Sequence, residues 1–321
     1  MPTGNVTLLE ATKSGGDLQK SGVVETIIQE SPMIEMLPWM AFSGNALKHS
    51  EEGTLPGVQF RNVNEGYTAS WGSDNEHFWG VSILGGEIKV DKYLVNVVGT
   101  EDDIEAKQWM KLGKANAMRF DYEAFKGTGS AASKGFKGIN SLISEGFGQT
   151  LAMGTNGLSM SATGGGLDKM DEAMDLFKNQ GMPDAALVNR TTRRSITSAA
   201  RNAFSGYSLI DVGTDVYGRQ VVKYNDIPLR IMGDGINSSG TVTPILDFDE
   251  TQGSSDVTSS VYFAKFGEDD VCGLLGQNGS MSVQSFGELE TAPQRMGRME
   301  WYPGIAIFNK YSIVRLTGVL A

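Results

Sequence analysis

The feature that most constrains this chain is a run of strand-forming and turn-forming residues between positions 58 and 98. Residues 58–63 predict an outgoing β-strand, residues 72–75 (Gly-Ser-Asp-Asn) predict a turn, and the apolar run 81–97 predicts a returning strand. A two-stranded ribbon is only marginally stable in water. Another surface must therefore cover the apolar side chains of this hairpin, and a second protein subunit is the cover that we expect.

The returning strand also carries a sign of where the ribbon ends. Its apolar alternation changes phase near Asp91 and Lys92. Ile88 and Val90 lie at even positions, whereas Tyr93, Val95 and Val97 lie at odd positions. Such a change predicts a bulge or bend at the point where the hairpin enters a globular body.

Large apolar side chains in the hairpin and in the segment before it are candidates for contacts between subunits. Residues 33–40 are apolar but interrupted by Pro38, a pattern too irregular for a helix and too apolar for a free linker, so we expect an arm that docks on another surface. An alternative for the hairpin aromatics is that they fold back on their own domain. The candidate contact residues are Leu37, Trp39, Phe60, Tyr67, Trp71, Phe78 and Trp79.

Helical periodicity is strongest over residues 102–125. Thr100 can cap this helix, and the acidic residues 101–103 suit the positive end of its dipole. One apolar face runs along it through Ala106, Met110, Gly113, Ala117, Phe120 and Ala124. Shorter helices are predicted at 167–180 and 191–204, and strands at 185–189, 216–224, 227–232, 261–266, 271–275, 280–284, 304–308 and 311–320.

Composition and charge narrow the function classes. The chain has 321 residues, enough for one large domain or two smaller ones, and its 41 glycines favour a β-rich fold with many turns. A formal charge of −11 repels phosphate, so sequence-specific DNA binding is not expected, although a protein that merely encloses nucleic acid is allowed. One cysteine, Cys272, excludes an intrachain disulfide framework and suits a reducing compartment. No signal peptide and no membrane-spanning run is evident.

The residues that usually carry catalysis are scarce. Two histidines, His49 and His77, and one buried-type cysteine give neither a nucleophile–base pair nor a zinc pattern. The Gly/Ser-rich segment 129–135 departs from a phosphate-binding loop, since Lys134 stands where the second glycine belongs and a helix precedes it. We therefore predict no enzyme activity, no cofactor and no metal. The alternative, an enzyme that binds a phosphorylated ligand at 127–166, stays open.

Two charged clusters have a plain structural interpretation. The acidic runs 247–250 and 268–270 are expected to be solvated turns, with a Ca²⁺ or Mg²⁺ site as the alternative. The arginines of the predicted helix 191–204 and Arg190 before it are expected to face an acidic neighbour, with phosphate contact as the alternative.

A set of short segments, in a fixed order along the chain, resembles a known protein family. Pro38-Trp39 precedes the hairpin, and Phe125–Gly129 and Gly135–Ile139 follow the long helix. Later segments are 183–190 (PDAALVNR), 218–220 (GRQ), 227–229 (IPL), 261–267 (VYFAKFG) and 301–309 (WYPGIAIFN). The ordered set resembles the major capsid protein of tailed bacteriophages over nearly the whole chain, whose fold is shared with encapsulins and the herpesvirus capsid floor.

The resemblance implies an α+β fold in four parts. These would be an N-terminal arm (1–53), an extended β-hairpin loop (54–90), a peripheral domain (91–139 and 286–321) with its spine helix at 102–125, and an axial domain (140–285). Some relatives join subunits by a Lys–Asn isopeptide bond from the extended loop, but no lysine occurs between Lys48 and Lys89. We therefore do not expect that bond.

The function implied is a structural one. The chain would self-assemble into hexamers and pentamers of an icosahedral phage head that encloses double-stranded DNA without sequence-specific binding, assembled in the host cytoplasm and rearranged during capsid maturation. Its partners would be copies of itself, a separate scaffolding protein, a portal and a decoration protein, with no membrane. The alternative is the shell of an encapsulin-like protein nanocompartment.

Overall fold

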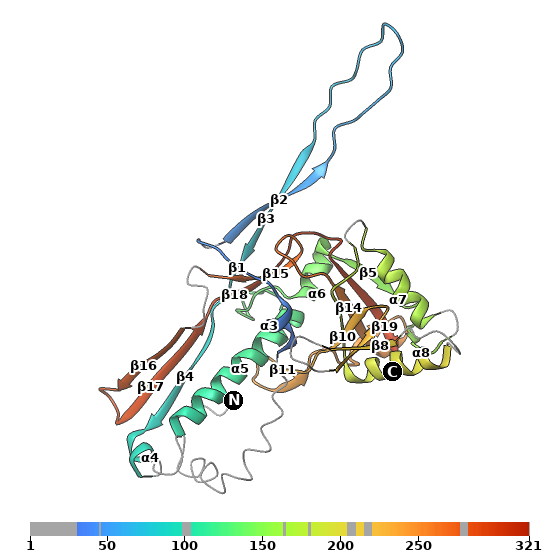
Figure 1. Cartoon of the computed structure of the whole chain (residues 1–321). Helices are drawn as coiled ribbons and strands as arrows, with labels where there is room; N and C mark the ends of the chain where they lie inside the picture. The colour runs from blue at the N-terminus through green and yellow to red at the C-terminus, as the bar shows by residue number, and fades with distance from the viewer. Residues whose placement is uncertain are drawn as a thin grey trace.

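The protein is described by a computed structural model that covers residues 31–44, 46–97, 104–162, 165–178, 181–203, 210–214, 220–276 and 282–320. A two-stranded hairpin projects far from the rest of the molecule (Figure 1). The body behind it combines one long helix beside a three-stranded sheet with a larger mixed sheet covered by helices (Figure 1). The α+β class expected from the sequence is therefore confirmed.

The projecting hairpin consists of β2 (Ala46–Thr54) and β3 (Ser73–Gly80), which pair antiparallel and are joined by the loop 55–72. The predicted outgoing strand 58–63 is wrong, because those residues lie in the loop. The predicted turn at 72–75 is wrong as well, because Ser73 already begins β3. The polar strand β2 gave no apolar alternation to recognise, since cross-strand pairs such as Lys48–Glu76 (2.6 Å) line it instead.

The predicted returning strand 81–97 divides into two elements. Strand β4 (Leu84–Asp91) leaves the hairpin and pairs antiparallel with β17 (Gln294–Trp301), which pairs in turn with β16 (Ser282–Glu288). Helix α4 (Lys92–Val97) begins directly after β4. The change of phase at Asp91 and Lys92 marks the start of this helix. The predicted bulge or bend at the point where the hairpin enters the body is wrong, because the hairpin ends at Gly80 and β4 already pairs with β17 inside the body.

The spine of this half is α5 (Ile104–Lys126), which confirms the predicted long helix from Ile104 onward. Thr100 and the acidic residues 101–103 lie outside the described residues. The helix buries its C-terminal half, where Phe120, Ala124 and Phe125 are inaccessible to solvent, whereas Met110 on the predicted apolar face is exposed. The helix ends at Lys126, and the N–H of Gly127 after it donates to the Glu123 carbonyl oxygen. A side chain at position 127 would collide with the Phe136 carbonyl oxygen, so this position requires glycine.

The larger sheet has nine strands. Seven of them follow in the order β5 (Gln149–Ala152), β19 (Ile313–Leu320), β14 (Ser255–Ala264), β7 (Ala185–Val188), β10 (Ile227–Ile231), β9 (Gln220–Tyr224) and β8 (Ile210–Thr214). Strand β13 (Glu250–Gln252) pairs with β14, and β6 (Leu158–Ser159) pairs with β19. Strand β7 (Ala185–Val188) is buried at every residue, as the sequence predicted, and pairs parallel with β10 and antiparallel with β14. Helices α7 (Gly166–Asp175) and α8 (Arg190–Ala203) contribute to the apolar cluster on one face of the sheet. The helix predicted at 191–204 is confirmed within the described residues. The helix predicted at 167–180 ends earlier than expected, because residues 176–178 follow α7 as turns.

The strands predicted at 261–266 and 271–275 are both present, in different sheets. The first lies in β14 of the nine-stranded sheet, and the second is β15 (Val271–Leu275). Strand β15 is the middle strand of a three-stranded sheet, between β1 (Trp39–Ala41) and β18 (Pro303–Ile307). The remaining elements are the paired strands β11 (Asp234–Ile236) and β12 (Val242–Pro244), the short helix α6 (Ile139–Leu142) and the π-helical turn η2 (Ile143–Phe147).

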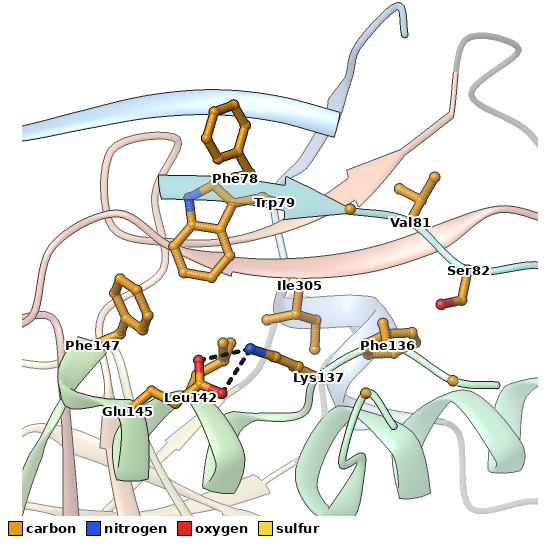
Figure 2. Close-up of a pocket in the computed structure, with 13 residues that line it drawn as sticks. Phe78, Trp79, Val81, Ser82, Phe136, Lys137, Leu142, Glu145, Phe147 and Ile305 are labelled. Atoms are coloured by element: carbon orange, nitrogen blue, oxygen red, sulfur yellow. Dashed lines mark hydrogen bonds and ion pairs between the residues drawn. The ribbon is translucent and has the colours of Figure 1, made fainter. Parts of the chain in front are cut away.

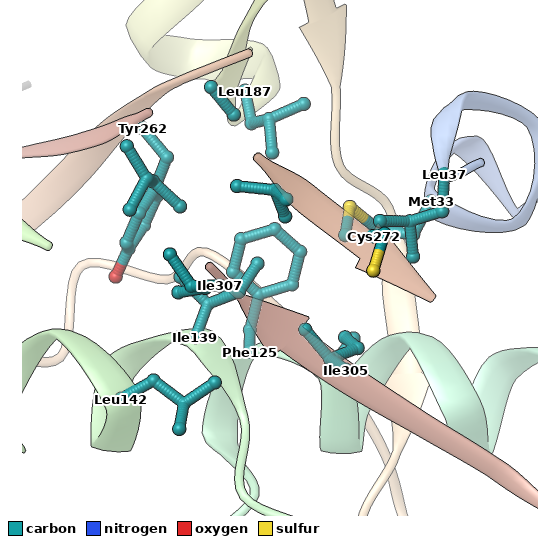
Figure 3. Packing of buried hydrophobic residues seen from close by; sticks show 14 of the residues in the cluster. Met33, Leu37, Phe125, Ile139, Leu142, Leu187, Tyr262, Cys272, Ile305 and Ile307 are labelled. Atoms are coloured by element: carbon teal, nitrogen blue, oxygen red, sulfur yellow. The ribbon is translucent and has the colours of Figure 1, made fainter. Parts of the chain in front are cut away.

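Residues 33–40 are ordered, against the prediction that they are too irregular for a helix. They contain α3 (Pro32–Met36) and the start of β1 (Trp39–Ala41). Pro32 occupies the first helical turn, where its missing N–H costs nothing, and the Ser31 side chain accepts a hydrogen bond from the Ile34 N–H. The short helix is held by packing, because Met33 and Leu37 enter the main core beside Cys272 and Ile305 (Figure 3).

Candidate assembly surface

The loop at the end of the hairpin, residues 55–72, holds the densest group of uncovered apolar side chains. Every residue from 52 to 76 is exposed in the chain. Phe60 is fully accessible and Trp71 is 86% accessible. Six of the seventeen large apolar side chains left exposed by the described residues lie in this loop: Leu55, Val58, Phe60, Val63, Tyr67 and Trp71.

Local bonds hold the end of this loop in one shape. The Asn62 N–H donates to Glu65 Oε2 over 2.9 Å, and this bond lowers the pKa of the Glu65 carboxyl group. Arg61 donates to the Glu65 carbonyl oxygen over 3.2 Å and stacks its guanidinium group on the Tyr67 ring at 5.3 Å. The loop therefore presents its apolar side chains from a partly ordered turn, which reduces the entropy lost on binding.

At the foot of the hairpin, one of two neighbouring aromatic residues is buried and the other is exposed. Trp79 is 5% accessible, and its ring packs on Phe147 (4.9 Å) and Phe308 (6.1 Å). Phe78 points to the other side of β3 and stays exposed. This alternation follows from strand geometry, because successive side chains point to opposite faces. Trp79 therefore anchors the hairpin to its own body, while Phe78 remains free to contact another surface.

A pocket lies beside this foot, with a cavity volume of about 310 Å³ (Figure 2). Its walls come from three separate stretches of the chain: the end of β3 with Val81 and Ser82, the segment 129–147, and Ile305 of β18. Lys137 and Glu145 form an ion pair on one side (2.7 Å), so the pocket carries no unpaired charge there. The apolar residues that line it are Phe78, whose ring points away from the cavity, and Trp79, Val81, Phe136, Leu142, Phe147 and Ile305.

Three of the candidate contact residues are covered, wholly or in part, by their own chain: Leu37, Trp39 and Trp79. Leu37 is buried inside the core of its own chain, and Trp39 is half-buried against Phe120 (5.5 Å) and Trp301 (5.3 Å). Strand β1 seats this segment by pairing parallel with β15. The prediction that Leu37, Trp39 and Trp79 lie at a contact between subunits depends on the assumption that nothing else covers them. That assumption is wrong. Phe60, Tyr67, Trp71 and Phe78 remain uncovered.

The pocket beside the hairpin foot went unrecognised in the sequence. Phe136, Phe147 and Ile305 are far apart along the chain, and no local pattern marks them as neighbours. The burial of Trp79 had a usable signal, since Phe78 and Trp79 are adjacent in a strand and only one of them can face outward.

The candidate catalytic groups do not form a reactive centre. Cys272 is fully buried, and burial raises the pKa of its thiol to about 12, which keeps it protonated and unreactive. His49 and His77 face each other across the hairpin and stack on Phe308 and Phe147. Near the segment 129–135, a side chain on Gly135 would collide with the Glu123 carboxylate, a neighbour that repels phosphate.

The acidic clusters make ion pairs, whereas the arginine cluster of α8 makes none among the described residues. Glu250 binds Arg315 (2.8 Å) and Asp249 binds Lys126 (2.9 Å), so the acidic run 247–250 makes ion pairs instead of only facing solvent. None of the described ion pairs involves the arginines of α8. Among the described residues, no group of three or more His, Cys, Asp or Glu side chains could hold a metal ion. In the same part of the chain, no helix has the length and apolar character needed to cross a membrane.

Comparison with known proteins identifies the fold. No protein-family model and no curated protein matches the sequence. Among solved structures, the SrpI encapsulin complex of Synechococcus elongatus has a TM-score of 0.64 at 12% identity, covering 92% of this chain and 89% of that one. A structure of Microbacterium phage Oxtober96 scores 0.63 at 12% identity, covering 98% and 99%. The capsid of an empty GTA particle scores 0.60 at 11% identity, covering 99% and 100%. The chain has the fold of tailed-phage major capsid proteins, which the encapsulin shares.

Proposed function

We propose that this chain is a structural shell protein that assembles with copies of itself into a closed icosahedral particle. The observation that carries the proposal is the projecting hairpin, whose loop exposes six large apolar side chains with no cover on its own chain. Soluble monomers rarely leave such a concentration of apolar surface in water. A shell subunit meets this requirement, because each copy covers the projections of its neighbours.

The specific form that we favour is the head of a tailed bacteriophage, built from hexamers and pentamers around double-stranded DNA. The net charge of −11 supports a shell that encloses DNA without gripping it, since a tightly held genome is hard to package and to release. In this role the chain acts by packing and not by catalysis. A scaffolding protein, a portal and a decoration protein are the further partners that such a head implies, in a particle assembled in the host cytoplasm.

A protein nanocompartment of the encapsulin type is the second candidate. The likeness to the SrpI encapsulin complex supports it, because its TM-score of 0.64 equals that of the phage structure within 0.01. Both candidates require the same hairpin contacts, so they differ only in what the particle holds.

The content of purified particles separates the two candidates. The full chain is expressed alone and with a candidate scaffolding protein, and closed shells are sought by electron microscopy. Particles from infected or induced host cells are then treated with nuclease and analysed for protected DNA and for enclosed protein. Protected double-stranded DNA of uniform length supports the phage head. A folded enzyme without DNA supports the nanocompartment, and the absence of any particle contradicts the shell itself.

A further inference from the structure

We propose that the apolar loop at the tip of one subunit's hairpin inserts an aromatic side chain into the pocket at the foot of a neighbouring subunit's hairpin. This inference rests on the proposed self-assembly and names the surface that receives the tip. It assigns two parts to the contact. The donor is the loop 55–72, and the receptor is the pocket lined by Val81, Ser82, Phe136 and Phe147.

The tip cannot occupy the pocket of its own chain. Strands β2 and β3 are paired from Ala46–Gly80 to Thr54–Ser73, so the ribbon is held straight. The eight residue steps from Trp71 to Trp79 span about 26 Å at roughly 3.3 Å per step. Figure 1 shows the loop at the far end of the hairpin from the body. Only a second copy can therefore bring a tip to this pocket.

Size and polarity fit the pair. The cavity of about 310 Å³ lies at the lower end of the range for binding pockets, roughly 300–1,000 Å³, which suits one aromatic side chain better than a whole segment. Figure 2 shows the ring of Trp79 and the side chains of Phe147 and Ile305 turned toward the cavity. Arg61 and Glu65 are the two charged residues of the loop, and Lys137 is already paired with Glu145. Neither surface has to bury an unpaired charge when they meet.

The area available is close to what a stable contact needs. One of the three aromatic side chains Phe60, Tyr67 and Trp71 enters the pocket, and the other two lie on the surface around it. Together they bury about 450–750 Å² when fully covered, at roughly 150–250 Å² each. A standard interface buries about 800 Å² on each partner. The three aliphatic residues of the loop can supply the difference.

The position of the two parts also determines the symmetry. A contact from tip to foot joins different surfaces on the two copies, so it is heterologous. Each subunit then offers one free tip and one free pocket, and repetition closes a ring when the rotation between neighbours allows it. Rings of six or five subunits are what the proposed shell requires.

Engineered disulfides test the contact in the intact protein. Ala69→Cys places a thiol beside the tip aromatics, and Ser82→Cys places one in the pocket wall. The natural Cys272 is buried and does not interfere. We expect particles of the A69C/S82C chain to give, after mild oxidation, a ladder of linked subunits on a non-reducing gel. The matched control pairs A69C with Ser198→Cys, on the exposed face of α8, and should stay a single band.

The outcomes separate this inference from the proposed function. A ladder in A69C/S82C alone supports the tip-to-pocket contact. Particles without a ladder, an equal ladder in the control, or a disulfide confined to the monomer would overturn it while leaving the shell intact. A second variant, Ser82→Trp, fills the pocket from its own wall. It should reduce particle yield at least tenfold, whereas Ser82→Ala should not, and normal yield from S82W overturns the contact too.

Discussion

The hydroxyl group of Ser31 donates a hydrogen bond to the carboxyl group of Asp121, 90 residues further along the chain. Asp121 is 4% accessible on α5, and Ser31 caps the first turn of α3. Burial raises the pKa of the Asp121 carboxyl group to about 7, and the bond from Ser31 offsets only part of that effect. The junction between the N-terminal segment and the spine helix therefore contains a group that titrates near neutral pH.

The first prediction concerns the stability of the subunit against pH. The pKa of Asp121 is about 7 in the folded state and 3.8 when unperturbed, so between these values the folded state binds more protons. The free energy of unfolding should fall as pH rises from about 4 to 7, by on the order of 4 kcal/mol from this group, and level off above 7. Urea denaturation of wild-type subunit and Asp121→Asn at several pH values measures it. An equal pH dependence in both proteins would contradict this assignment.

The second prediction separates the two tryptophans of the hairpin. Trp71→Ala combined with Phe60→Ala should change the free energy of unfolding by less than about 0.5 kcal/mol, because both side chains are exposed, yet it should abolish assembly. Trp79→Ala should instead cost about 3–5 kcal/mol, because it empties a buried site. Denaturant titration and particle yield are the two measurements. Normal particles from the F60A/W71A chain would refute the role of the tip.

The third prediction tests the packing of β17 on α5. A side chain at Gly297 would lie 2.1 Å from the ring of Trp109, a rigid neighbour, so Gly297→Ala should destabilise the subunit by about 1–3 kcal/mol. Gly66→Ala is the matched control, because no atom lies within 4 Å of the added methyl group. Comparable stability of the two variants in denaturant would show that this sheet does not pack on the helix as described.

The fourth prediction concerns covalent links between subunits. No lysine lies between Lys48 and Lys89, so the hairpin loop offers no amine for an isopeptide bond. Mature particles boiled in detergent should run as one band near 34.5 kDa. A ladder that resists reducing agent would reveal a link formed elsewhere.

The fifth prediction concerns nucleic acid. With a net charge of −11, the purified subunit should bind double-stranded DNA more weakly than about 100 µM at roughly 150 mM salt. Fluorescence anisotropy with a labelled duplex measures this affinity. Submicromolar binding at that salt concentration would contradict the view that the shell encloses DNA without gripping it.

Elements that are marked by a pattern within a short stretch of sequence could be predicted. The helix periodicity of α5, the buried run of β7 and the turn at Asn225 and Asp226 between β9 and β10 were all predictable, and that turn has the positive φ angles its residues favour. The hairpin was predicted as an element but not in its register, because the apolar residues 58–63 lie in a loop while the paired strand β2 is polar.

Most of the features that could not be predicted from the sequence depend on contacts between residues far apart in the chain. The partner of β4 is β17, some two hundred residues away, and nothing near β4 indicates it. The burial of Leu37 likewise depends on distant parts of the main core. The candidate contact residues of the loop were identifiable because exposure there follows from a ribbon that leaves the body, whereas the pocket needed three segments to come together.

Sedimentation velocity of the purified full chain, beside its F60A/W71A variant, tests the central claim most directly. We expect the wild-type protein to sediment as rings or closed shells over a range of concentrations, and the variant to sediment as a folded monomer of 34.5 kDa. A wild-type chain that stays a stable monomer at every concentration, alone and with candidate scaffold, would contradict the claim that copies of this chain cover each other's hairpins.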